Sequence, residues 1–185
     1  MERHGWDEVT AQSNADDAAK ARRRSPHRLA TEWYRGAGPI WCLTLCARHH
    51  CRPFEKQGLA DGVVNALRFY RDRGKCKVYT YSLMPDHLHV ILALTADVKG
   101  DHAHEEPGLR ELIAAFKSYT TTQIAWKHGL RGRLWQRDFY DHLARNPTDF
   151  EEQCWYVLNN PVRQRLVEDW QDYPWSGIMD EWRDL

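Results

Sequence analysis

The sequence predicts an α+β domain in which an antiparallel sheet packs against helices. Short apolar runs with β-branched and aromatic residues alternate with longer segments whose apolar residues recur at spacings of three and four. Two of the strand-like runs are divided only by Pro85 and Asp86, which favours adjacent, antiparallel strands. Hydrophobic residues make up 42% of the 185-residue chain, so the composition is that of a protein with a packed core.

The first half of the domain has the pattern strand, helix, strand, strand. Residues 39–50 are β-branched, aromatic and Cys-rich and predict the first strand. Apolar residues at helical spacing predict a helix over 54–73, with Gly74 as its C-terminal stop. Residues 76–85 and 87–97 predict the second and third strands.

The second half continues with a loop, a helix, an extended segment and a last helix. Composition predicts a loop over 98–108, and one apolar face predicts a helix over 109–130 that ends at Gly129 or Gly132. We interpret 133–146 as extended. The last helix, 147–160, has marked ends: Asn146 as N-cap, Pro147 at the first position, Asp149 in the first turn and Pro161 after the end. This order of elements is compatible with a ferredoxin-like arrangement.

Composition bounds the class of protein. Residues 1–30 are polar and end in a basic cluster, so we expect a flexible arm ahead of a single domain over 31–185. That cluster can touch phosphate or stay solvated. The 26 Lys and Arg balance the 26 Asp and Glu, so a basic surface would require an uneven distribution of charge. The five cysteines show no C-x-x-C spacing, and no apolar run is long enough for a membrane span; we expect a cytoplasmic protein with reduced thiols.

The stretch MPDHLHVILAL places two histidines at the start of the third predicted strand. Alternate residues of a strand share a face, so His87 and His89 project the same way, followed by Ile91 and Ala93. Both imidazoles can reach one metal ion, although two ligands rarely suffice. Two hydrogen-bonded core histidines are the alternative interpretation.

Two other histidine pairs lack this combination of scaffold and spacing. His102 and His104 also stand two apart, but in a polar loop beside Gly and Pro. His49 and His50 are adjacent and would point apart on a strand.

The last predicted helix adds Tyr156 and Asn160, four residues apart and therefore on one face. Phe150, Cys154 and Val157 point elsewhere and can pack. If the first face lies over the histidine strand, Asn160 could offer an amide oxygen to the ion, with Tyr156 beside it. A tyrosine at the edge of the core is the ordinary alternative.

Four blocks follow in order along the chain: MPDHLHVIL, LWQRDFYDHLARN, YVLNNPVRQRLV and DYPWSG. Together they resemble the REP-associated tyrosine transposases, a branch of the single-tyrosine HUH transposases, over roughly residues 39–177. The name HUH denotes His–hydrophobic–His, here His87–Leu88–His89. The resemblance implies a ferredoxin-like HUH transposase core. The family often has Gly where Arg165 and Asp138 stand, and Ser where Gly177 stands.

The resemblance implies a role for each matching residue. His87 and His89 are the metal pair, Asn160 completes the metal shell and Tyr156 is the nucleophile. The implied metal is Mg²⁺ or Mn²⁺. The implied reaction cleaves and rejoins single-stranded DNA at hairpin-forming repetitive palindromes through a 5′-phosphotyrosine intermediate, without ATP. Gln136 belongs to the WQ block, and its role is left open.

The resemblance also implies a DNA partner, a nucleoid-associated location and no membrane contact; a homodimer and a monomer are both open. Trp135 and Trp175 can stack on bases or pack in the core. The candidates for phosphate contact are Lys117, Lys127, Arg131, Arg133, Arg163 and Arg165.

Two other functions stay open from the sequence. One is a catalytically silent protein that binds DNA hairpins as a regulator. The other is a metal-dependent nuclease that uses water, with Tyr156 in a structural role.

Overall fold

The computed structural model describes residues 38–48, 51–95 and 108–182, all of which fall within one compact unit. The predicted arm, 1–30, and the pairs His49–His50 and His102–His104 lie outside these ranges. The five cysteines carry free thiols. Within the described ranges, no helix is both long and apolar enough to cross a membrane.

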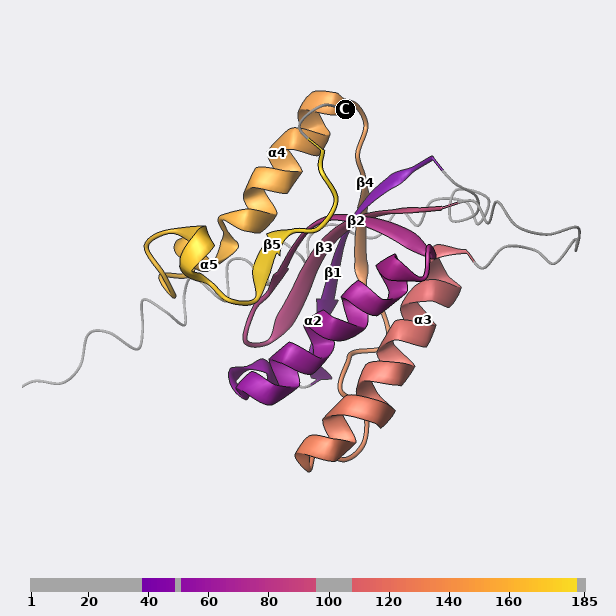
Figure 1. Ribbon diagram of the computed structural model, residues 1–185, viewed down its shortest axis with the longest axis vertical. Helices are drawn as coiled ribbons and strands as arrows, with labels where there is room; N and C mark the ends of the chain where they lie inside the picture. Colours follow the sequence, from indigo (N-terminus) through magenta and orange to yellow (C-terminus); the bar gives the residue numbers. More distant parts are fainter. Residues whose placement is uncertain (1–37, 49–50, 96–107, 183–185) are drawn as a thin grey trace, which may run out of the picture. The chain divides into compact units, whose positions relative to one another are not determined.

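One antiparallel sheet forms the centre of the fold (Figure 1). Its strand order is β4-β1-β3-β2-β5, and all four neighbouring pairs are antiparallel. The order of the first four strands is that of the ferredoxin-like split β-α-β pair, so the predicted α+β class is confirmed. The strands are β1 (Ile40–Cys46), β2 (Cys76–Leu83), β3 (His87–Leu94), β4 (Tyr140–Leu143) and β5 (Ser176–Ile178).

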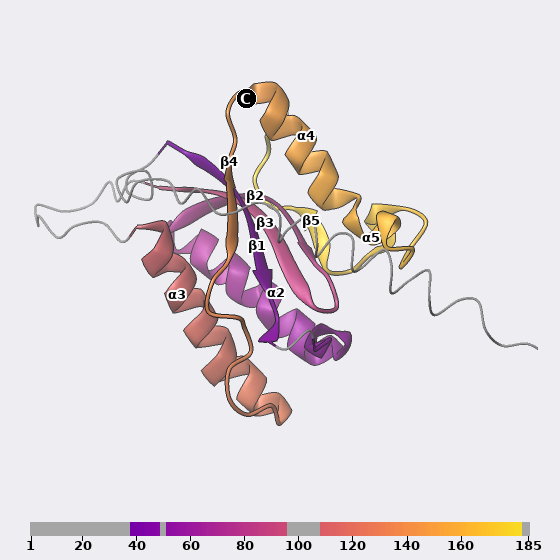
Figure 2. The ribbon, with the colours of Figure 1, turned by 180° about the vertical axis from the view of Figure 1, so that it is seen from behind.

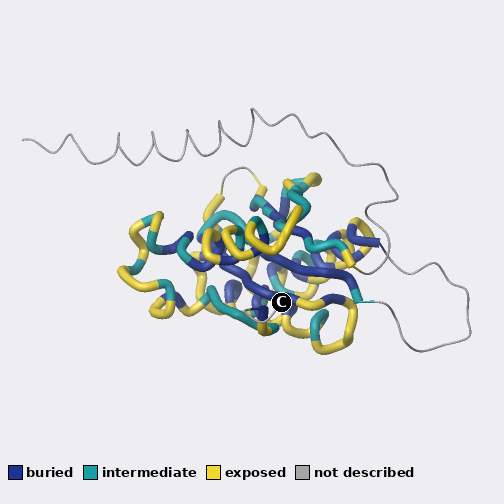
Figure 3. Tube along the Cα trace, turned by 90° about the horizontal axis from the view of Figure 1, so that it is seen from above, coloured by how far each residue is buried: buried dark blue, intermediate teal, exposed yellow. Residues whose placement is uncertain are grey.

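The helices cover both faces of the sheet (Figure 1, Figure 2). Helices α2 (Gln57–Asp72) and α3 (Leu109–Tyr119) lie together on one face. Helix α4 (Pro147–Leu158) crosses the other face and contacts β2 and β3. In Figure 3 the buried segments of the chain run through the centre, and the exposed segments lie around them. The short helical segments are η3 (Pro53–Glu55), η4 (Thr120–Ile124), η5 (Ala125–His128), α5 (Asn160–Arg163) and η6 (Trp170–Asp172).

The α2–α3 face holds the larger part of the aliphatic core. Leu88, Val90 and Leu92 of β3 lie on this face, where they meet Leu67 of α2 and Phe116 of α3. Burial of one such side chain contributes about 1.5–3 kcal/mol. The alternation predicted for β3 is confirmed, because these residues point away from α4.

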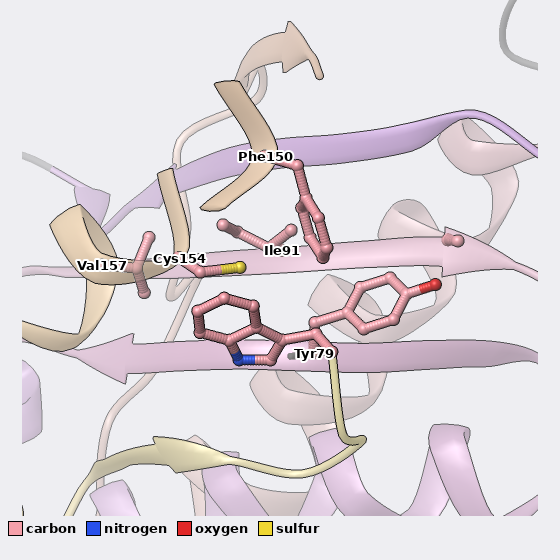
Figure 4. Packing of buried hydrophobic residues seen from close by; sticks show 7 residues of the cluster. Tyr79, Ile91, Phe150, Cys154 and Val157 are labelled. Atoms are coloured by element: carbon pink, nitrogen blue, oxygen red, sulfur yellow. The ribbon is translucent and has the colours of Figure 1, made fainter. Parts of the chain in front are cut away.

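A second cluster fixes α4 on the opposite face (Figure 4). Phe150, Cys154 and Val157 of α4 pack against Tyr79 of β2 and Ile91 of β3. The rings of Phe150 and Tyr79 meet edge-on at 5.1 Å between centroids. Since Ile91 follows His89 on the same side of β3, this packing seats α4 over the histidine face.

The helix predicted over 109–130 is helical from Leu109 to His128 but changes its winding. After Tyr119 it continues as a π turn over Thr120–Ile124 and a 3₁₀ turn over Ala125–His128. The hydroxyls of Thr120 and Thr121 donate to carbonyls one turn back, at 2.8 and 2.7 Å, and such back-bonding bends helices. Of the two glycines predicted to end the segment, Gly129, at φ 81°, is the one that does so.

Two other predicted elements differ at their ends. Of the extended segment 133–146, only β4 is a regular strand, although Trp135 also bridges to Ala47. The last helix ends at Leu158 rather than at residue 160, and Asn160 begins the separate α5. The break arises because Pro161 has no N–H to continue the ladder of hydrogen bonds. Strand β5 was not predicted, since three residues are too few to show a period.

Candidate functional site

The two histidines of β3 lie side by side on the face covered by α4. Strand β3 begins at His87, and the alternation of the strand brings His89 to the same side. Their ring centroids are 4.6 Å apart and their planes are inclined at 83°. The sequence prediction that the two imidazoles share one face is confirmed by this geometry.

The carboxylate of Asp86 orients the first ring. Nδ1–H of His87 donates to Oδ1 of Asp86 at 2.6 Å. A carboxylate only accepts, so Nδ1 of His87 carries the proton of this bond, and in the neutral form of the ring the lone pair lies on Nε2. Burial raises the pKa of the Asp86 carboxyl, but the hydrogen bond and charge of His87 outweigh it and hold that pKa below its ordinary value.

The second ring is held from the neighbouring strand. Thr44 of β1 pairs directly with His89, and its Oγ1 lies 2.8 Å from Nδ1 of the ring in a hydrogen bond. Burial, and then the charges of His87 and Arg163, lower the pKa of His89 well below its usual value. The ring is therefore neutral at pH 7. In the tautomer that donates to Thr44, Nε2 presents a lone pair.

Helix α4 brings Tyr156 to this pair. The rings of Tyr156 and His89 meet edge-on at 5.9 Å between centroids. The side of the helix that carries Phe150 and Cys154 is buried, whereas Tyr156 is 41% exposed. The guanidinium of Arg163 lies over the phenol ring at 4.4 Å from its centroid, within cation–π distance. The phenol ring thus lies beside the imidazole of His89 and remains partly exposed to solvent.

The side chain of Asn160 supplies an unmatched oxygen. The residue is 3% exposed, and its Oδ1 has no hydrogen-bond partner among the described residues. A buried acceptor without a donor costs free energy, so the oxygen is suited to a cation or a donor from a ligand. In the described part of the chain, no three His, Cys, Asp or Glu side chains gather around one point. Two imidazole nitrogens and this amide oxygen are the donor set that the resemblance implies for a divalent ion.

Gln136 fastens the segment before β4 to the end of β1. Its Nε2 donates to the carbonyl of Ala47 at 3.2 Å, and its backbone N–H donates to the carbonyl of Cys46 at 2.9 Å. Cys46 pairs in turn with His87. The sequence left the role of Gln136 open. In the structure, Gln136 makes hydrogen bonds to backbone carbonyls at the histidine end of the sheet.

The six basic candidates for phosphate contact differ in their surroundings. Nζ of Lys117 donates to three backbone carbonyls, those of residues 136, 137 and 138, and burial lowers its pKa to about 8. A phosphate contact from Lys117 would have to replace one of these bonds. Arg131 donates to the carbonyl of Trp126 at 2.8 Å. Arg163 contacts Tyr156, while Lys127, Arg133 and Arg165 are exposed.

Both tryptophans that could have stacked on bases are engaged within the fold. Trp135 is buried against Phe54, and its indole N–H donates to Thr120 at 2.8 Å. The indole N–H of Trp175 donates to Asp61 at 2.9 Å. The core interpretation holds for Trp135.

From the sequence alone, Thr44 is not identified as a residue of the candidate site. Its position opposite His89 follows only from the register in which β1 pairs with β3.

The protein is of the class in which a ferredoxin-like sheet carries a His-x-His pair next to a helix that bears a tyrosine. Known proteins of this kind are therefore the ones to compare it with. The chain is 29% identical, over 106 residues, to a candidate REP-associated tyrosine transposase of Haemophilus influenzae. It is 27% identical, over 110 residues, to the REP-associated tyrosine transposase of Escherichia coli. These matches cover 52% and 60% of this chain and span 55% and 58% of the two relatives. The resemblance to REP-associated tyrosine transposases is thereby confirmed.

The comparison of structures agrees with that of sequences. A solved REP-associated tyrosine transposase bound to a REP hairpin matches 77% of this chain and 78% of its own, with a TM-score of 0.53 and 23% identity. This likeness shows the fold. No family model matches the chain.

Proposed function

We propose that the protein cleaves and rejoins single-stranded DNA at hairpin-forming repetitive palindromes, as a REP-associated tyrosine transposase. The observation that carries this proposal is the open phenol of Tyr156 against the ring of His89. The two relatives named as transposases support it, as does the fold shared with a protein solved on a REP hairpin.

Tyr156 is the nucleophile of the proposed reaction. Its Oη forms a bond to the phosphorus of a phosphodiester while the bond from phosphorus to the 3′ oxygen breaks. The phenol proton passes to water, and the departing 3′ oxygen takes a proton from water. The products are a 5′-phosphotyrosine and a free 3′-hydroxyl. Attack by another 3′-hydroxyl reverses the step and joins strands, and the covalent link conserves the bond energy, so ATP is not required.

His87, His89 and Asn160 would hold a divalent cation, Mg²⁺ or Mn²⁺. When bound, the cation would neutralise charge on the phosphate and orient it. Imidazole ligands favour Mn²⁺ somewhat. The protein prepares the donor atoms: Asp86 and Thr44 engage Nδ1 of the two rings, which leaves Nε2 of each for the ion.

The test uses the full chain, Mn²⁺ and hairpin oligonucleotides with single-stranded flanks, taken from palindromes near the gene. We expect a covalent adduct that survives SDS and is abolished in Tyr156→Phe. Tyr119→Phe is the matched control, because Tyr119 is 40% exposed but lies on α3. His89→Ala should lose metal-dependent cleavage and keep much of the DNA binding.

Two outcomes would contradict this proposal, and each would favour a different function. Cleavage that persists in Tyr156→Phe would favour a nuclease that uses water. Hairpin binding by the parent without cleavage would favour a catalytically silent regulator. Sedimentation of the DNA complex would show whether it holds one or two copies of the protein.

A further inference from the structure

The edge strand β4 places a second tyrosine on the face of the candidate site. In the sheet, Thr44 pairs with His89 on one side and with Tyr140 on the other. Directly opposed residues of antiparallel strands project to the same face. Since Thr44 bonds to the ring of His89, the side chain of Tyr140 also projects to the histidine face.

The next alternate residue of β4 gives an independent check of this direction. His142 pairs with Cys42, and its Nε2 lies 3.1 Å from Oδ2 of Asp149 in α4. His142 therefore faces α4, and Tyr140, two residues earlier, faces the same side. Neighbouring strands are about 4.8 Å apart, so the backbones of Tyr140 and His89 are separated by about 10 Å.

The side chain of Tyr140 is exposed to solvent, whereas the other tyrosines of the sheet strands are buried. It is 46% exposed, whereas Tyr79 and Tyr81 on β2 are 6% and 4% exposed. Charges of both signs stand close by along the chain, with Asp138 and Asp141 on either side of Tyr140. The ammonium of Lys117 donates to the carbonyl of Asp138 at 2.9 Å, and Arg137 is exposed. An exposed aromatic ring on the face of the candidate site is suited to stacking on an unpaired base.

We propose that Tyr140 stacks on an unpaired base of the DNA next to the site of cleavage; this rests on the proposed function. Stacking on an aromatic ring tolerates any base, because every base has a π face. In a duplex those faces are covered by neighbouring bases. The ring therefore selects the single-stranded flank of a hairpin and holds it about two strands away from the histidines.

The experiment compares two labelled DNAs, a hairpin with a single-stranded flank and the same hairpin without it, by fluorescence anisotropy. Tyr140→Leu should weaken binding of the flanked hairpin about thirtyfold, the middle of the range for loss of one stacked base, and leave the bare hairpin unchanged. Tyr140→Phe keeps the ring and should bind as the parent does. Tyr119→Leu makes the same change at a similarly exposed tyrosine of α3, the helix on the other face of the sheet, and should have no effect.

Abasic sites along the flank identify the stacked base. At one position, removal of the base should weaken binding by the parent but not by Tyr140→Leu, as expected for two partners of one contact. The proposal is overturned if Tyr140→Leu binds the flanked hairpin like the parent, or if both hairpins lose affinity equally. Failure of Tyr140→Phe to restore binding would also overturn it, because the hydroxyl rather than the ring would then matter.

The same samples separate this inference from the proposed reaction. If the parent forms no adduct but the flank-specific loss in Tyr140→Leu appears, only the catalytic proposal fails. If the adduct forms and Tyr140→Leu retains full affinity for the flank, only the stacking role fails. A parent that binds neither DNA overturns both.

Discussion

The ring of Tyr156 meets the ring of His89 edge-on, with 5.9 Å between centroids and 78° between planes. One residue comes from α4 and the other from β3. Their contact depends on the cluster of Phe150, Cys154 and Val157 that seats the helix on the sheet. The candidate chemistry therefore depends on packing that none of its own residues provides.

Thr44→Val should weaken metal binding. The valine keeps the shape of the side chain but removes the hydroxyl 2.8 Å from Nδ1 of His89, so the ring loses its orientation. Loss of such a partner typically costs about 10- to 100-fold in metal affinity. Titration calorimetry with Mn²⁺ measures the effect without DNA. Thr122→Val, on the π turn, is the control. Equal affinity in Thr44→Val and the parent would contradict the role of Thr44.

Arg163→Gln should slow formation of the adduct at saturating DNA by about two- to fivefold, which corresponds to an exposed cation–π contact of about 0.5–1 kcal/mol. The reason is that the guanidinium over the ring at 4.4 Å limits the orientations of Tyr156. Arg163→Lys should restore part of the rate. Arg165→Gly removes the same charge two residues later and should leave the rate unchanged. A higher Kd with an unchanged rate would instead assign Arg163 to phosphate binding.

Arg165→Gly should stabilise the protein by roughly 0.5–1 kcal/mol. Arg165 has φ 56°, a left-handed backbone that costs an L residue about 1–2 kcal/mol, and glycine offsets part of that gain through its unfolded-state entropy. Thermal unfolding should show Tm higher by about 2–4 °C per kcal/mol. Arg163→Gly, within the right-handed α5, should lower Tm. A fall in Tm for both variants would refute the strain at residue 165.

Asn146→Ala should destabilise the protein by about 1 kcal/mol. The Oδ1 atom of Asn146 accepts the N–H of Asp149 at 2.9 Å and caps α4, the helix that carries Tyr156. Urea unfolding measures the loss as a lower midpoint with an unchanged slope. Asn146→Ser, which keeps a capping oxygen, should lie close to the parent. A midpoint for Asn146→Ala equal to that of the parent would show that the cap contributes nothing.

Acid should destabilise the parent more than Asp149→Asn. The N–H of Arg145, and then His142, hold the pKa of the Asp149 carboxyl below its ordinary value. A pKa lowered by folding contributes stability above the unfolded value, about 3.9, and that stability is lost as pH falls through the folded value. Urea midpoints between pH 6 and pH 3 should therefore fall more steeply in the parent. Parallel curves would contradict the assignment.

Local spacing was enough to predict the faces of the elements. The two-residue period of β3 placed His87 and His89 on one side, and the end signals of α4 located Asn146 as its cap. The resemblance of four sequence blocks added Tyr156 and Asn160. These features depend on residues close to one another in the chain, and sequence reports such relations directly.

The tertiary structure alone decided which distant residues meet. Thr44 and Tyr140 flank one another only through the register of β1 and β4, and nothing in their local sequence marks them. The contact between Arg163 and Tyr156 and the unmatched oxygen of Asn160 arise from the turn at Pro161 and from burial. Periodicity in the sequence determines which face of the sheet a residue lies on. Its partners on neighbouring strands are set by long-range packing, because a shift of one residue in the register of a strand would change every one of its contacts.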